Sequence, residues 1–238
     1  MPRTAVDLSV MGPRPDELGE VHVTETATAT NRTTGGWLLV GAGITGAASA
    51  VFLAFLPPLV GNDRFGYPLA PTGFIAIQIF FFVHHLAVVW GLLAVWRSGF
   101  AGDGRLARIG GLASVVSMAL LAVQELVAIS ATDAAYPSEA TGTVEGVYGV
   151  LSLLNGAALI VFGIAVLRAR RWGGWSRLVP LVLSVYVIVP LTPAIFGPFV
   201  VARLTIGLWM LLFALLGLIL LRVHVGDAQS PTSELEPQ

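Results

Sequence analysis

The stretch Leu204-Thr-Ile-Gly-Leu-Trp-Met-Leu-Leu-Phe-Ala-Leu-Leu-Gly-Leu-Ile-Leu-Leu221 contains eighteen consecutive residues without an acidic, basic or histidine side chain. A helix needs about 20 apolar residues to cross the hydrocarbon core of a bilayer, where no water satisfies free backbone groups. This stretch therefore predicts a transmembrane helix.

Five further apolar runs precede this one, and apart from Glu125 they contain no acidic residue. Only 11% of the 238 residues are charged, against roughly 25% in an ordinary soluble domain. We therefore predict an all-α integral membrane bundle of six transmembrane helices, without a soluble domain. The spans are expected at about 36–60, 70–96, 109–131, 146–167, 178–199 and 204–221.

The two ends of the chain are polar. Residues 1–35 and 223–238 contain too few apolar side chains to repay the entropy of ordering. We expect both segments to be disordered tails, on either side of a membrane domain at 36–222.

The arginines indicate an orientation, because short cytoplasmic loops are enriched in Lys and Arg. The chain has thirteen arginines and no lysine. If both termini are cytoplasmic, only Arg64 and Arg203 fall on the opposite side. We therefore predict a multi-pass protein of the cytoplasmic (inner) membrane with both termini cytoplasmic. The tryptophans expected at the cytoplasmic edge of the bilayer are Trp37, Trp96, Trp172 and Trp175.

Composition excludes several functions. A net charge of -1 gives no basic excess that would attract nucleic acid, and the absence of Cys removes thiolate nucleophiles and sulfur-ligated metals. The expected partners are the lipid bilayer and, in addition, other membrane proteins or further copies of the chain.

The segment Gly41-Ala-Gly-Ile-Thr-Gly46 matches the Gly-x-Gly-x-x-Gly fingerprint of dinucleotide-binding proteins. That fingerprint works only between a strand and a helix of a Rossmann fold, and no further strands are predicted here. Small residues spaced by four instead give a smooth helical face for close packing. The predicted packing residues are Ala42, Gly43, Gly46 and Ala50.

Polar residues inside the spans are the candidate functional residues, because an ionisable group there costs about 2.5 to 3.5 kcal/mol to insert. Gln78 and His85 are seven residues apart and share a helical face, whereas His84 points off that face. The candidate intramembrane cluster comprises Glu125, His85, His84, Gln78, Gln124, Asn155, Tyr186 and Arg203.

Depth along the spans, counted at about 1.5 Å per residue, divides these candidates into two layers. Gln78 and Arg203 are expected at the level of Glu125 near the outer edge, with His85 near the midplane. Glu125 is then either one member of a satisfied structural pair or a group that handles a proton or a substrate.

No pattern indicates catalysis, a metal or a cofactor, and we predict none of the three. Neighbouring His84 and His85 diverge by about 100° on a helix, so they do not ligate one metal together. Nucleophile and zinc motifs such as Gly-x-Ser-x-Gly and His-Glu-x-x-His are absent from the sequence.

The fifth span is irregular, with three prolines and a glycine in Val187-Ile-Val-Pro-Leu-Thr-Pro-Ala-Ile-Phe-Gly-Pro198. We expect the helix to end near Val189, with the proline stretch as an outer turn. The alternative is a broken helix of the kind that lines substrate sites in transporters.

The segments Arg171-Trp-Gly-Gly-Trp-Ser-Arg-Leu-Val-Pro180 and Gly207-Leu-Trp-Met-Leu-Leu-Phe-Ala-Leu-Leu-Gly217, with Pro190 and Pro193 between them, cover the last third of the chain. In composition this part resembles uncharacterised small multi-pass membrane proteins of GC-rich bacteria. The resemblance implies the architecture, and it brings no activity or functional residue with it.

Three hypotheses for the function follow. The first is a non-enzymatic accessory or signalling component that acts through helix packing. The second is a small transporter or proton-coupled permease that uses Glu125, His85 and the break after Tyr186. The third is a membrane redox protein or metalloenzyme.

Overall fold

The structure, a computed structural model, describes residues 15–228, with side chains from 30 to 222. Every regular element in this part of the chain is helical, and the one backbone bridge joins Arg64 to Ala135. The elements are α1 (Pro15–Phe55), α2 (Pro71–Arg97), α3 (Arg105–Ala128), η2 (Ile129–Ala131), α4 (Glu139–Ala169), η3 (Gly174–Leu178), α5 (Val179–Tyr186), η4 (Val187–Leu191), α6 (Thr192–Ile195) and α7 (Phe199–Ala228).

Six helical stretches are long and apolar enough to cross a membrane. They are Thr30–Phe55, Pro71–Arg97, Arg105–Ala131, Glu139–Ala169, Gly174–Ile195 and Phe199–Arg222. By length and composition, the chain is a multi-pass membrane protein. The predicted all-α bundle of six helices is confirmed.

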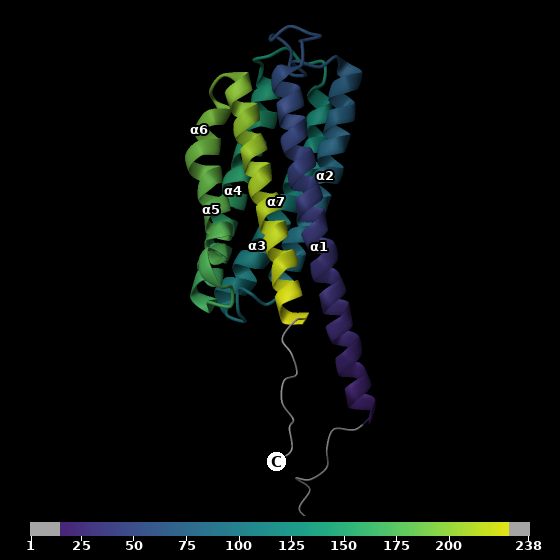
Figure 1. The fold of residues 1–238 in the computed structure, drawn as a ribbon. Helices are drawn as coiled ribbons and strands as arrows, with labels where there is room; N and C mark the ends of the chain where they lie inside the picture. Colours follow the sequence, from purple (N-terminus) through teal and green to yellow (C-terminus); the bar gives the residue numbers. More distant parts are fainter. Residues whose placement is uncertain (1–14, 229–238) are drawn as a thin grey trace, which may run out of the picture.

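The helices form an elongated bundle in which each span packs against the next in the sequence (Figure 1). The last helix, α7, returns to the first and makes with α1 the most extensive contact in the bundle. The chain thus closes on itself, and α2, α3, α4 and α7 all face the interior that holds the candidate site.

Small residues permit the closest contacts between helices. A Cβ on Gly43 of α1 would lie 2.5 Å from the backbone nitrogen of Ala214 on α7. A Cβ on Gly110 of α3 would likewise lie 2.5 Å from the backbone nitrogen of Phe162 on α4. Glycine is therefore required at both positions if the backbones are to approach this closely.

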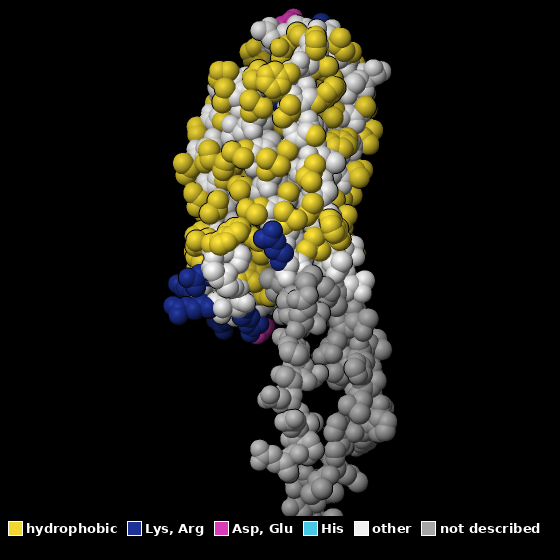
Figure 2. Space-filling model, in the orientation of Figure 1, with side chains coloured by type: hydrophobic (Ala, Val, Ile, Leu, Met, Phe, Trp, Pro, Cys, Tyr) yellow, Lys and Arg dark blue, Asp and Glu magenta, His cyan; other side chains and the backbone are white. Residues whose placement is uncertain are grey.

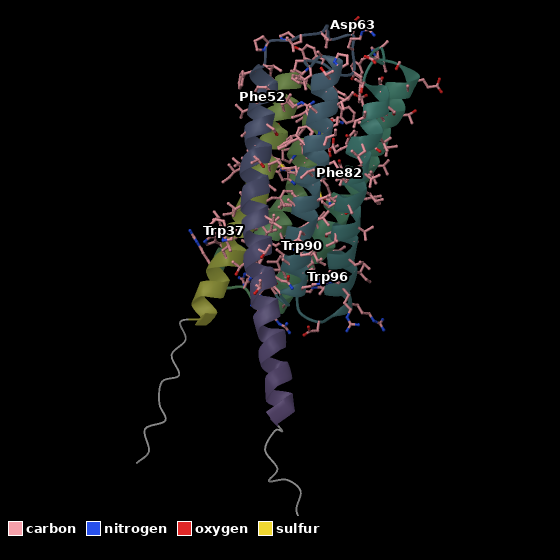
Figure 3. All side chains as sticks on the ribbon, turned by 90° about the vertical axis from the view of Figure 1, so that its right-hand side faces the viewer. Trp37, Phe52, Asp63, Phe82, Trp90 and Trp96 are labelled. Carbon is pink, nitrogen blue, oxygen red and sulfur yellow. The ribbon has the colours of Figure 1, made fainter. Side chains whose placement is uncertain are left out.

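Hydrophobic side chains cover the visible face of the bundle along most of its length (Figure 2). Many aliphatic and aromatic side chains that a soluble protein would bury are exposed here, including Phe52 and Val83. Trp37, Trp90 and Trp96 lie toward the end opposite Asp63 (Figure 3). An apolar surface of this kind is suited to contact with the acyl chains of lipids.

One of the predicted interfacial tryptophans is buried in the protein. Trp172 is only 2% exposed, and its ring lies 5.0 Å from that of Phe100. The loop after α4 therefore folds Trp172 against the turn between α2 and α3, and its level relative to the bilayer stays a prediction. Trp37 and Trp175 are exposed.

Helices extend into both of the segments that were predicted to be disordered tails. Residues 1–14 and 229–238 lie outside the described residues, whereas 15–35 are part of α1 and 223–228 are part of α7. The sequence allows the early start, because Pro15 followed by Asp16 and Glu17 is a typical helix N-terminus.

The fifth span continues beyond Val189, so the expectation that it ends there is wrong. It passes through the π-helical turn η4, which contains Pro190, and ends at Ile195. The backbone N–H of Thr192 donates to the carbonyl of Val187 in the wider register, and the Thr192 hydroxyl donates to the same carbonyl at 2.7 Å. A π-turn accommodates the missing proline N–H without breaking the helix.

Candidate functional site

The centre of the site is a hydrogen bond between two helices. The Tyr148 hydroxyl on α4 donates to Oε2 of Glu125 on α3 at 2.7 Å. Gln78 on α2 donates weakly from Nε2 to the Tyr148 hydroxyl at 3.3 Å and to the Glu125 backbone carbonyl at 3.4 Å. Three consecutive spans therefore meet at one buried carboxylate.

A histidine faces the other carboxylate oxygen. Nδ1 of His85 lies 3.7 Å from Oε1 of Glu125 and 2.8 Å from the carbonyl oxygen of Phe81. Because a carbonyl only accepts hydrogen bonds, we assign the ring hydrogen to Nδ1, which donates to Phe81. This bond holds the imidazole against the backbone one helical turn earlier in α2, beside the Glu125 carboxylate.

A positive charge comes from the last helix. The Arg203 guanidinium on α7 interacts electrostatically with Glu125 and with Tyr148. Its carbon Cζ lies 5.0 Å from the centre of the Phe199 ring, so an aromatic face also supports the cation. Within the described part of the chain, no ion pair of 4.0 Å or less joins Arg203 to Glu125.

We call Glu125, Tyr148, Gln78, His85 and Arg203 the Glu125 cluster. It contains an acid, an imidazole, a phenol and a guanidinium from α2, α3, α4 and α7, in surroundings that are otherwise apolar. A carboxylate with a hydrogen-bond donor on one oxygen and an imidazole beside the other can accept and release a proton without leaving its place.

The structure separates four other candidates from this cluster. His84 binds the Ala42 carbonyl on α1 through Nε2 at 2.6 Å, and Gln124 donates to the Val144 carbonyl at 3.2 Å. The remaining two are Asn155, which donates to Ser117 Oγ on α3 at 3.0 Å, and Tyr186, which donates to the Thr205 carbonyl on α7 at 3.2 Å. Each of these side chains links two spans.

The predicted packing residues lie in a row on α1. Ala42 and Ala50 are buried, and a Cβ on Gly207 of α7 would lie 3.1 Å from the Cβ of Ala50. A Cβ on Gly46 would lie 2.6 Å from Nε2 of His84 and 2.8 Å from Cγ of Met210. The row thus faces α7 and His84.

Tyr148 is the functional candidate that the sequence analysis missed. The predicted span begins at 146, which places Tyr148 at the bilayer edge, whereas α4 begins at Glu139. The tyrosine therefore lies more than two helical turns inside the helix. The capping box formed by Ser138 and Thr141 is the sequence signal that marks the true start.

The two predicted polar layers meet at Glu125. His85, expected near the midplane, contacts the carboxylate that was expected nearer the outer edge. The His85 ring reaches back to the Phe81 carbonyl, one helical turn earlier in α2, so depth counted along the backbone alone overestimates their separation.

Metal and cofactor sites need several converging ligands. Among the residues that the structure describes, no three His, Asp or Glu side chains gather as a metal site requires. The His84 and His85 rings meet edge to face at 84° and bind different helices. They do not converge on one metal or haem.

Comparison with known proteins finds no matching family model, no similar curated protein and no similar solved structure. The fold and the site define the class by themselves: a six-span membrane protein, by length and composition, with an ionisable cluster inside the bundle.

Proposed function

We propose that this protein is a small proton-coupled permease, with Glu125 as the group that takes up and releases the proton. One observation carries the proposal: an acid, an imidazole and a phenol from three spans are in contact inside the bundle. Ionisable residues in this position are rare in membrane proteins and commonly mark ion or substrate pathways.

Each member of the Glu125 cluster has a role in this proposal. Tyr148 holds the ionised carboxylate through its hydroxyl, and the Nδ1–H of His85 faces its other oxygen. Arg203 balances the negative charge when the proton has left. Because the four charged or titratable groups come from four spans, a change in the protonation of Glu125 alters the forces between those spans.

The π-turn of the fifth span supports motion. Thr192 and Val187 form this turn, and π-turns inside helices are frequent at functional sites. Tyr186, immediately before the turn, binds α7, the helix that carries Arg203. The irregular span is thus linked to the helix that supplies the positive charge.

The proposal places the protein in a cytoplasmic (inner) membrane with both termini in the cytoplasm. The positions of the arginine side chains support this orientation. Figure 2 shows basic side chains gathered at the lower end of the visible face, and short arginine-rich loops remain on the cytoplasmic side.

Transport by proteoliposomes tests the proposal. Purified protein is reconstituted with a pH-sensitive dye inside, and outward gradients of small carboxylates, amines and sugars are imposed in turn. We expect at least one gradient to drive proton movement, which Glu125→Gln abolishes and Glu145→Gln, a change at an exposed carboxylate of α4, leaves intact. Solute-driven proton movement that persists in Glu125→Gln would contradict the assignment.

A non-enzymatic accessory or signalling component is the second candidate, and a different observation favours it. Gly142, Gly146 and Gly149 are exposed on α4, and a Cβ at any of them would meet no described atom within 4 Å. Glycines at this spacing form association surfaces in membranes.

Oligomeric state separates the two candidates. If α4 is an association surface, Gly146→Ile should convert a dimer into a monomer in sedimentation of the detergent-solubilised protein. Gly41→Ile on α1 is the matched control, because Gly41 also faces open space. If the detergent-solubilised wild-type protein sediments as a monomer, this candidate loses its support.

A further inference from the structure

The loop between α4 and α5 concentrates positive charge. Arg168, Arg170, Arg171 and Arg177 lie within ten residues of one another, and all four are exposed. The nearest acidic residues along the chain are Glu145 before the loop and Asp227 after it. No acid of the loop itself neutralises this charge.

The loop is held in place by the turn between α2 and α3. Arg171 donates from Nη1 to the Gly99 carbonyl at 2.7 Å and from Nη2 to Oδ2 of Asp103 at 2.8 Å. Trp172 is buried against Phe100. One arginine and one tryptophan therefore anchor the loop, and its other basic residues are left for another partner.

Those other basic residues are Arg168, Arg170 and Arg177. Among the described residues, none of the three forms an ion pair of 4.0 Å or less with an acid. Arg170 also has a positive φ of 53° at the C-terminus of α4, where the chain reverses. Three exposed guanidinium groups therefore lie in the short segment from the last turn of α4 to η3.

Exposed apolar side chains lie beside these guanidinium groups. Trp175 is 58% exposed and Leu178 is 45% exposed, and the fifth span begins in the same segment. A tryptophan ring at the end of a span prefers the boundary between headgroups and acyl chains. The basic loop therefore lies at the level of the lipid headgroups.

We propose that this loop binds the headgroup phosphate of an anionic phospholipid in the adjoining leaflet. Arg168, Arg170 and Arg177 supply the donors to the phosphate, and Trp175 packs against the upper part of the acyl chains. Guanidinium groups bind phosphate through paired hydrogen bonds, and basic clusters beside spans recognise anionic headgroups. The site is separate from the Glu125 cluster, so it does not depend on the transport proposal.

Native mass spectrometry of the full chain, released from micelles with phosphatidylglycerol or phosphatidylcholine, tests this inference. We expect wild-type protein to retain phosphatidylglycerol preferentially. The triple variant Arg168→Gln/Arg170→Gln/Arg177→Gln should bind it at least about tenfold more weakly. The matched control, Arg97→Gln/Arg105→Gln/Arg108→Gln, removes three other exposed arginines from the same end and should change binding by less than about threefold.

A lysine variant controls for loss of folding in the glutamine variant. Arg168→Lys/Arg170→Lys/Arg177→Lys keeps the charge but not the paired hydrogen bonds, so its binding should lie between that of the wild type and that of the glutamine variant. Equal losses in the control and loop variants, no loss in either, or a lysine variant as weak as the glutamine variant would each overturn the proposal. Complete displacement of the lipid by millimolar inorganic phosphate would also overturn it, because the site would then be one for free phosphate.

Discussion

The Tyr148 hydroxyl donates a 2.7 Å hydrogen bond to Oε2 of Glu125, and this bond joins α4 to α3 inside an apolar bundle. Hydrogen bonds to ionised groups contribute more than those between neutral groups, because the partner charge strengthens them. The pair therefore both stabilises the bundle and sets the position of the carboxylate that we assign to proton exchange.

The strength of this pair can be measured by a double-mutant cycle. Tyr148→Phe, Glu125→Leu and the double variant are unfolded in micelles, and the coupling free energy is taken from the three changes. We expect about 1 kcal/mol, between the average for interhelical bonds in membranes and the value for charged bonds in water. The matched cycle with Tyr136→Phe, a loop tyrosine that is 39% exposed, should give additivity within about 0.5 kcal/mol. Similar coupling in both cycles would show that the Tyr148 bond contributes nothing specific.

The contact between α1 and α7 predicts a contrast between two neighbouring glycines. Gly43→Ala places a Cβ 2.5 Å from the backbone nitrogen of Ala214, and it should lower the free energy of unfolding by about 1 to 3 kcal/mol. Gly41→Ala meets no atom within 4 Å, and it should leave stability unchanged or raise it by up to about 1 kcal/mol. Thermal unfolding of both variants in the same detergent checks this. Equal effects at the two positions would mean that α1 and α7 are not packed as described.

The six spans could be predicted from the sequence because length and apolar character determine which segments cross a bilayer. The start of α4 was missed because its first two turns include the polar residues Glu139, Thr141 and Thr143, and only the capping box of Ser138 and Thr141 marks it. Hydropathy does not distinguish a helix that projects beyond the apolar core from a polar loop. The continuation of the fifth span was missed for another reason. A proline indicates a break, whereas the π-turn that absorbs Pro190 depends on the neighbouring Thr192.

The candidate site could be predicted in part. Gln78 and His85 share a face of one helix, and both contact the residues around Glu125. Helical periodicity predicts such a face, but it does not predict which helix lies opposite. The contacts from Tyr148 to Glu125 and from His84 to α1 could therefore be identified only once it was known which spans are neighbours.

The π-turn provides a third prediction. Thr192→Val removes the hydroxyl that donates to the Val187 carbonyl at 2.7 Å, and it should lower the free energy of unfolding by about 1 kcal/mol. Thr143→Val is the control, because its hydroxyl donates to the Glu139 carbonyl at an exposed position that water can reach. We expect the control to change stability by less than about 0.5 kcal/mol. A larger loss in the control would argue against a special role for Thr192.

The orientation can be tested because the chain has no cysteine. Single cysteines at Asp133 and Gly173, both exposed and at opposite ends of the bundle, are labelled in intact cells with a reagent that does not cross the membrane. Asp133→Cys should react from outside, and Gly173→Cys should react only after the cells are opened. The reverse pattern would contradict cytoplasmic termini.

The most direct test of the central claim is infrared spectroscopy of the reconstituted protein as the pH of the bathing solution is stepped. If Glu125 exchanges a proton with bulk water, the difference spectrum contains a carboxyl C=O band that shifts in D2O. This band should be absent in Glu125→Gln and present in Glu145→Gln. A spectrum without any band that depends on Glu125, across the range in which the protein stays folded, would show that the carboxylate is a structural group and not a proton carrier.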